Sequence, residues 1–179
     1  MKKYRTHTCG ELTKSHKEKE ISLAGWINKK RDHGNLLFID LRDNYGITQC
    51  VVEKNNKNFF ELEKLQLESV IKVEGKVVER SKETINPEIK TGEIEIYLRT
   101  YSLLGECKEL PMPVFSDQEY SEEIRLKYRF LDLRRKKIHE NIILRSKVIS
   151  FIRNKMEELG FLEFQTPILT SSSPEGARD

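Results

Sequence analysis

Apolar and polar residues alternate along short stretches in the first half of the chain. From Ile21 to Asn28, Leu23 and Ile27 fall on one side, and the segment from Leu36 to Arg42 repeats the pattern. Such alternation is typical of strands that bury one face. The pattern predicts strands at 21–28, 36–42, 47–52, 70–78 and 93–99, and a short helix at 59–67.

The order of these elements is three strands, a helix and two further strands. A five-stranded barrel with a helix between its third and fourth strands is the OB-fold arrangement, a recurrent binder of oligonucleotides. We therefore expect a mainly β domain over residues 1–105. By itself, the pattern also fits other small barrels.

The second part of the chain has a different character. Pro111 and Pro113 lie in a stretch without periodicity, which marks a boundary. Beyond it the sequence becomes charged and helical. We expect a hinge or linker over residues 106–139 and, over residues 140–179, the start of an α/β domain.

Only two regular elements are expected after the hinge. The apolar stripe predicts an amphipathic helix at 141–159 with Gly160 as its stop signal, and a short strand at 161–165. One helix and one strand cannot bury both of their faces alone. This part is therefore either a truncated domain or an oligomer interface.

Composition narrows the class of protein. Hydrophobic residues make up 37% of the chain and charged residues 34%, with a mean hydropathy of −0.62, as in a soluble globular protein. No apolar run approaches the ~18 residues of a transmembrane helix, and no apolar stretch follows Met1 as in a secretory signal. We expect a cytoplasmic protein with no membrane contact. Cys9, Cys50 and Cys107 are too far apart for a metal pair or a disulfide framework, and we expect Cys50 in the core.

Charge adds a hint about partners. The net charge is only +3, but basic residues gather at Lys29–Arg31 and again between Arg125 and Lys137. Such clusters are an electrostatic footprint for nucleic acid, and they equally describe solvated surfaces.

One face of the expected barrel carries candidate chemistry. Phe38 is expected on the outside of its strand, where an aromatic ring can stack on a base. Gln49 lies on the neighbouring strand, Glu95 on the last strand and Arg31 in the first loop. An aromatic ring, an amide, a carboxylate and a guanidinium can together hold a base and recognise its edge. Surface decoration is the alternative for each of them singly.

Three longer strings resemble one protein family. Residues 25–53 read GWINKKRDHGNLLFIDLRDNYGITQCVVE and resemble the anticodon-binding barrel of class IIb aminoacyl-tRNA synthetases, which serve aspartate, asparagine and lysine. Residues 125–135 read RLKYRFLDLRR and look like the junction between hinge and catalytic domain. Residues 161–179 read FLEFQTPILTSSSPEGARD and are similar to class II motif 1 running into the aspartate-binding loop of the bacterial aspartyl branch.

The resemblance implies an activity and a set of partners. Enzymes of this family use ATP and Mg²⁺ to convert L-aspartate to aspartyl-adenylate and then transfer it to tRNA(Asp). By match, Phe38 is the base-stacking aromatic, and Arg31, Gln49 and Glu95 fall on anticodon-contacting positions. The resemblance further implies an OB-fold barrel, a hinge and the truncated first segment of a class II catalytic domain.

The same match assigns roles in the second part of the chain. Glu175 falls on a position that contacts the substrate aspartate, where a carboxylate can pair with the α-ammonium group. The helix at 141–159 matches the segment that builds a class II homodimer interface. The ATP-binding and magnesium-binding motifs are expected beyond Asp179. This fragment is therefore expected to hold no catalytic or metal-binding residue, to bind no cofactor and to be inactive alone.

His33 suggests a relaxed choice of tRNA. The anticodons GUC and GUU differ only in their last base, and a neutral imidazole can donate or accept a hydrogen bond by choosing its tautomer. In this family, histidine at this loop position accompanies enzymes that also charge tRNA(Asn). The alternative is an exposed loop histidine without a role.

Two other functions remain open from the residues. One is a stand-alone OB-fold nucleic-acid-binding module that uses its helix as an oligomerisation arm. The other is a fragment of an asparaginyl- or lysyl-tRNA synthetase. The string Glu175-Gly176-Ala177-Arg178-Asp179 argues against the first, because a plain binder has no use for a substrate-binding loop.

Overall fold

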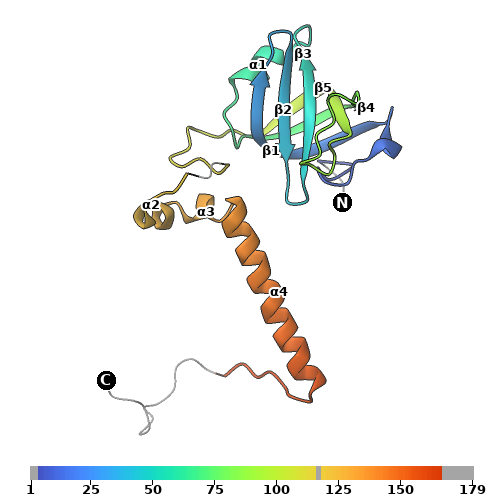
Figure 1. Cartoon of the computed structure of the whole chain (residues 1–179). Coiled ribbons are helices and arrows are strands. Elements are labelled where there is room, and N and C mark those ends of the chain that lie inside the picture. The colour runs from blue at the N-terminus through green and yellow to red at the C-terminus, as the bar shows by residue number, and fades with distance from the viewer. Residues whose placement is uncertain (1–3, 116–117, 167–179) are drawn as a thin grey trace. The chain divides into compact units, whose positions relative to one another are not determined.

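The computed structural model describes residues 4–115 and 118–166 (Figure 1). The chain divides into two compact units, Met1–Pro111 and Met112–Asp179, called here the barrel unit and the helical unit. The division into 1–105, 106–139 and 140–179 that the sequence suggests remains a prediction.

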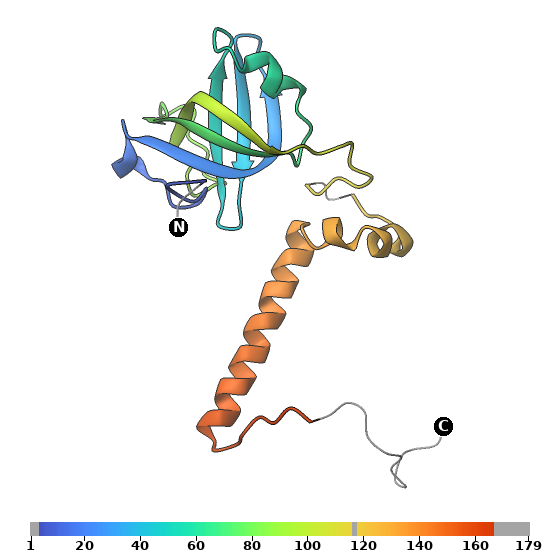
Figure 2. The same ribbon diagram turned by 180° about the vertical axis from the view of Figure 1, so that it is seen from behind.

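The barrel unit is a closed five-stranded barrel with the strand order β1-β2-β3-β5-β4. The helix α1 lies between β3 and β4 in sequence and at one end of the barrel in space (Figures 1 and 2). The expected OB-fold arrangement is confirmed. The elements are η1 (Lys14–His16), β1 (Glu20–Asp32), β2 (Leu36–Arg42), β3 (Ile47–Glu53), α1 (Phe59–Lys64), β4 (Val70–Glu79) and β5 (Ile94–Gly105).

The barrel interior is filled by the alternating apolar side chains. Leu23, Ile39 and Ile96 are fully buried, and so is Cys50, as expected for a small core residue. Phe59 of α1 joins the same core. Each Å² of apolar surface removed from water contributes ~25 cal/mol, so this burial specifies which face of each strand points inward.

The first strand is longer than the alternation indicates. β1 continues past Asn28 through a bulge between Ile27 and Lys29, and Arg31 pairs in register with Phe38. Arg31 therefore lies in a strand, and its expected place in a loop is wrong. The remaining turn is tight, with Gly34 in the left-handed region at a φ of 77°.

The helical unit is built from α2 (Glu122–Lys127), α3 (Arg129–Asp132) and α4 (Lys136–Glu158). α4 begins at Lys136, five residues before the expected start. The apolar stripe did not reveal these residues, because the first turns of the helix are charged. The helix ends at Glu158, one residue before the expected end, and the expected stop signal Gly160 follows with a φ of 86°. The amides of Gly160 and Phe161 donate to the carbonyls of Glu157 and Met156, closing the helix end in a Schellman motif.

The strand expected at 161–165 is not formed, and residues 161–166 carry no regular structure. A strand needs a neighbour for its amides and carbonyls, and every strand in the described part of the chain belongs to the barrel. Glu175 lies outside the described residues.

Candidate nucleic-acid interface

Three of the predicted site residues meet on the outside of the barrel. The Arg31 guanidinium donates hydrogen bonds to Asp40 and to the Gln49 side-chain carbonyl, each at 2.9 Å. The Gln49 amide nitrogen then donates to Glu95 at 3.0 Å. This chain of side chains crosses from β1 over β2 and β3 to β5, and we call the surface around it the polar face.

Phe38 lies in the neighbouring row of the same face. It sits opposite Arg31 on β1 and Val51 on β3, between the inward-facing Leu37 and Ile39. Phe38 is half-buried, so part of its ring remains open to solvent. The edge of the exposed His33 ring meets it at a centroid distance of 5.3 Å and an interplanar angle of 86°. The stacking candidate and the specificity candidate are thus in contact.

Burial sets the protonation behaviour of the two carboxylates. Desolvation raises the pKa of Asp40, and the nearby Arg31 opposes this effect only in part. Desolvation also raises the pKa of Glu95, against the influence of Arg80 and of the hydrogen bond from Gln49. Ionised carboxylates in partly dry surroundings are strong hydrogen-bond acceptors, suited to the amino groups of bases.

Arg80 is a member of this surface that the sequence pattern missed. Its side chain is 4% exposed and lies 3.7 Å from the Glu95 carboxylate. It donates to the carbonyls of Ile94 and Thr84, which fastens the loop between β4 and β5. Its Nη2 atom is buried without a partner among the described residues. The polar sequence that follows Val78 indicated only a loop, and no periodicity distinguished Arg80.

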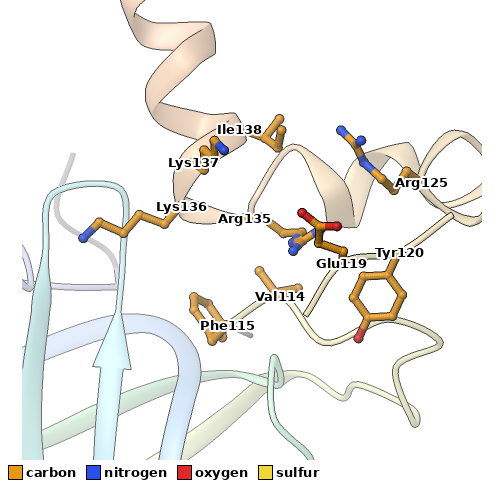
Figure 3. A pocket seen from close by; sticks show the side chains of 9 residues that line it. All are labelled: Val114, Phe115, Glu119, Tyr120, Arg125, Arg135, Lys136, Lys137 and Ile138. Carbon is orange, nitrogen blue, oxygen red and sulfur yellow. The ribbon is translucent and has the colours of Figure 1, made fainter. Parts of the chain in front are cut away.

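The helical unit holds a second basic surface. A pocket of about 610 Å³ is lined by Arg125, Arg135, Lys136 and Lys137, with Glu119 as its acidic member (Figure 3). A concave basic surface of this kind attracts polyanions.

The arginines of this region are arranged around a single acid. The fully buried Asp132 carboxylate lies 3.2 Å from Arg125, 2.5 Å from Arg129 and 3.7 Å from Arg135. The acid thereby holds the guanidinium groups near one another, and part of each remains exposed.

The described residues contain no group of three or more His, Cys, Asp or Glu side chains that could hold a metal ion. In the same residues, no helix has both the length and the apolar character needed to cross a bilayer.

Two families match separate parts of the chain. Residues 21–104 match the family described as OB-fold nucleic acid binding domain, which covers the barrel and the polar face. Residues 121–179 match the family described as tRNA synthetases class II (D, K and N).

Curated relatives match over the full chain. The aspartate–tRNA(Asp/Asn) ligase of Pelagibacter ubique is 76% identical over 179 residues, which are 100% of this chain and 30% of the relative. The corresponding ligase of Phenylobacterium zucineum is 59% identical over 98% of this chain and 30% of its own length. The chain thus spans 30% of the length of these relatives.

Solved structures share the fold. An asparaginyl-tRNA synthetase from Pyrococcus horikoshii, in complex with asparaginyl-adenylate, has a TM-score of 0.81 at 28% identity, over 95% of this chain and 38% of that one. An aspartyl-tRNA synthetase from Leishmania major has a TM-score of 0.80 at 21% identity, over 93% of this chain and 36% of that one, a likeness of fold alone. The chain therefore joins a barrel of the OB-fold nucleic acid binding family to a segment of the class II (D, K and N) tRNA synthetase family, and over its full length it is similar to aspartate–tRNA(Asp/Asn) ligases.

Proposed function

We propose that this chain is the tRNA-recognising part of an aspartate–tRNA ligase and that its polar face binds the anticodon. The observation that carries the proposal is the hydrogen-bonded chain from Arg31 through Gln49 to Glu95, which lies beside Phe38 on the same face. The polar groups are thereby held in place before any RNA arrives, which lowers the entropic cost of binding.

Each group of the polar face supplies a different interaction. Phe38 stacks under one unpaired base, and stacking of this kind contributes ~1–3 kcal/mol per base. Gln49 and Glu95 offer donors and acceptors to base edges, and Arg31 adds positive charge for a base carbonyl or a phosphate.

His33 is the proposed reason for a relaxed choice of tRNA. Its imidazole lies at the edge of the Phe38 ring, so it borders the space in which a stacked base would lie. A neutral imidazole can meet either the amino group of cytosine or the carbonyl of uracil. We therefore propose that both tRNA(Asp) and tRNA(Asn) are bound, in keeping with the names of the closely similar relatives.

The complete protein would carry the chemistry of its family in the cytoplasm. It would activate L-aspartate with ATP and Mg²⁺ and transfer it to tRNA, and Glu175 is proposed to bind the substrate ammonium group. The helix α4 has no buried residue, and its apolar side chains, such as Ile149 and Ile152, are exposed. A homodimer partner that covers this stripe would remove its apolar surface from water.

Binding of an anticodon stem-loop tests the proposal. The 179-residue chain is expected to bind a tRNA(Asp) stem-loop, and Phe38→Ala should weaken this binding by ~1–3 kcal/mol through loss of one stacked base. Phe60→Ala is the matched control, because Phe60 is a phenylalanine that is 57% exposed and belongs to α1 rather than to the strands of the polar face. Filter binding at one fixed salt concentration measures all three proteins. Equal affinities of the two variants would show that Phe38 does not contact the RNA.

A further inference from the structure

Tyr97 is an exposed aromatic residue that has no role in the proposed anticodon site. It lies on β5 between the buried residues Ile96 and Leu98, and 37% of it is exposed. It pairs in register with Val51 on β3, and Val51 in turn pairs with Phe38 on β2. Residues directly opposite each other on neighbouring strands share one face. Phe38, Val51 and Tyr97 therefore form a single row across three strands.

This apolar row runs beside a polar row that contains Gln49 and Glu95. Glu95 precedes Tyr97 by two residues on β5, and Gln49 precedes Val51 by two residues on β3, so each polar residue shares a face with its apolar neighbour. The hydrogen bond from Gln49 to Glu95 shows that the outward side chains of β3 and β5 converge. Val51 is only 2% exposed although it lies outside the core cluster of the barrel. The middle of the row is therefore covered, and the two aromatic residues, Phe38 and Tyr97, lie at its ends.

The spacing suits separate bases. Neighbouring strands lie ~4.8 Å apart, which puts Phe38 and Tyr97 about 10 Å apart across the intervening strand. At that separation each ring can receive its own base. The surroundings also keep the phenol neutral, because burial and the nearby Glu95 and Glu53 raise the pKa of Tyr97.

We propose that Tyr97 is a second base-stacking residue of the polar face, which receives an unpaired anticodon-loop base other than the one on Phe38. The proposal rests on the proposed function, because it assumes that RNA binds to this face. On this proposal, the side chains of the polar row form hydrogen bonds with the edges of bases, and the aromatic rings of the apolar row stack on the faces of bases.

Affinity measurements with the 179-residue chain and a tRNA(Asp) anticodon stem-loop test the proposal. Tyr97→Ala should weaken binding by about tenfold or more, whereas Tyr97→Phe, which keeps the ring, should bind within about twofold of the natural chain. Tyr45→Ala is the matched control, because Tyr45 is 59% exposed in the turn between β2 and β3. A Tyr97→Ala variant that binds as tightly as Tyr45→Ala overturns the proposal. Equal losses for Tyr97→Phe and Tyr97→Ala overturn it as well, since they assign the effect to the hydroxyl group.

A second measurement identifies the base. Stem-loops with 2-aminopurine at single anticodon-loop positions report stacking as quenching of their fluorescence. Tyr97→Ala should restore the fluorescence at one position and Phe38→Ala at a different one, and restoration at the same position by both variants overturns the proposal. If the natural chain binds no stem-loop at all, the proposed function itself fails. Binding that is lost in Phe38→Ala but unchanged in Tyr97→Ala contradicts only the role of Tyr97.

Discussion

At the scale of single residues, Gln49 organises the polar face. Its carbonyl oxygen accepts from Arg31 and its amide nitrogen donates to Glu95. A guanidinium has only donors and an ionised carboxylate only acceptors, so the two neighbours allow one orientation of the amide. Gln49 is also buried, which leaves it little freedom to turn. The polar face therefore presents a fixed order of donors and acceptors.

The half-buried carboxylates of this face, Asp40 and Glu95, should reduce the stability of the barrel at neutral pH. The folded-state pKa of Asp40 and of Glu95 is raised by burial, so ionisation costs folding free energy as the pH rises through those values. The double variant Asp40→Asn, Glu95→Gln should therefore have a higher free energy of unfolding than the natural chain at neutral pH. The difference should shrink as the pH falls, because protonation of the two carboxyl groups removes the cost of burying their charge.

Urea denaturation across this pH range measures the effect. Glu83→Gln, at an exposed position of the loop between β4 and β5, is the control for loss of a negative charge. A double variant that is less stable than the natural chain at neutral pH would show that the contacts of the carboxylates outweigh their desolvation.

His33 should decide between the two tRNAs. His33→Leu removes the group that can meet uracil, and a buried carbonyl left without a donor costs ~1–3 kcal/mol. Binding of a stem-loop with the anticodon GUU should therefore fall by roughly tenfold or more, at 1.4 kcal/mol per decade, while binding of the GUC stem-loop is retained. Parallel losses for both stem-loops would assign His33 to general packing against Phe38.

At the scale of elements, β1 connects the polar face to the helix at the barrel end. The residue before Arg31, Lys30, directs its ammonium group to the carbonyls of Leu62, at 3.4 Å, and Glu63, at 2.5 Å, and also to that of Leu65. Leu62 and Glu63 lie in the last turn of α1 and Leu65 is its C-terminal cap residue, where carbonyls lack partners within the helix. β1 thus places the Arg31 guanidinium on the polar face and, with the preceding side chain, caps the end of α1.

Loss of the Lys30 ammonium should loosen α1. Lys30→Met keeps most of the aliphatic stem but leaves the carbonyls at the end of the helix to water, and we expect a loss of about 1 kcal/mol in the free energy of unfolding. Lys29→Met, at the exposed neighbouring position, is the control. Chemical denaturation of both variants gives the comparison, and equal stabilities would mean that solvent replaces the ammonium at no cost.

The alternation of apolar residues was enough to place the barrel strands, because burial of one face dictates a period of two. It could not show that β1 extends to Asp32, since the added residues are polar and are held by pairing with β2. It also could not identify Arg80, whose contacts come from residues distant in sequence. The strand expected at 161–165 had a suitable composition but has no neighbour among the described residues.

At the scale of the whole molecule, the two units differ in how they satisfy their apolar surface. The barrel unit encloses a core built from all five strands and α1. The long helix of the other unit has no buried residue. A unit that buries its own core can fold by itself, whereas one that exposes its apolar stripe depends on a partner.

The barrel unit should therefore fold alone. A chain that ends after Pro111 is expected to give a cooperative thermal transition and a β-rich circular dichroism spectrum, because every strand of the closed sheet is retained. A broad transition without cooperativity would mean that the barrel needs the residues after Pro111. The full 179-residue chain serves as the reference.

The barrel closes unevenly around its circumference. β4 and β5 pair along almost their whole lengths, whereas β3 and β5 pair in parallel at Cys50–Ile96 and Val51–Tyr97. The short pairing makes this seam the place where the closed sheet should open most readily, with the fastest amide exchange. Gln49 and Glu95 lie on the two strands of this seam, so an RNA that contacts both residues would hold the strands together. RNA binding and local opening of the barrel would then be linked. A bound anticodon would make opening between β3 and β5 less frequent.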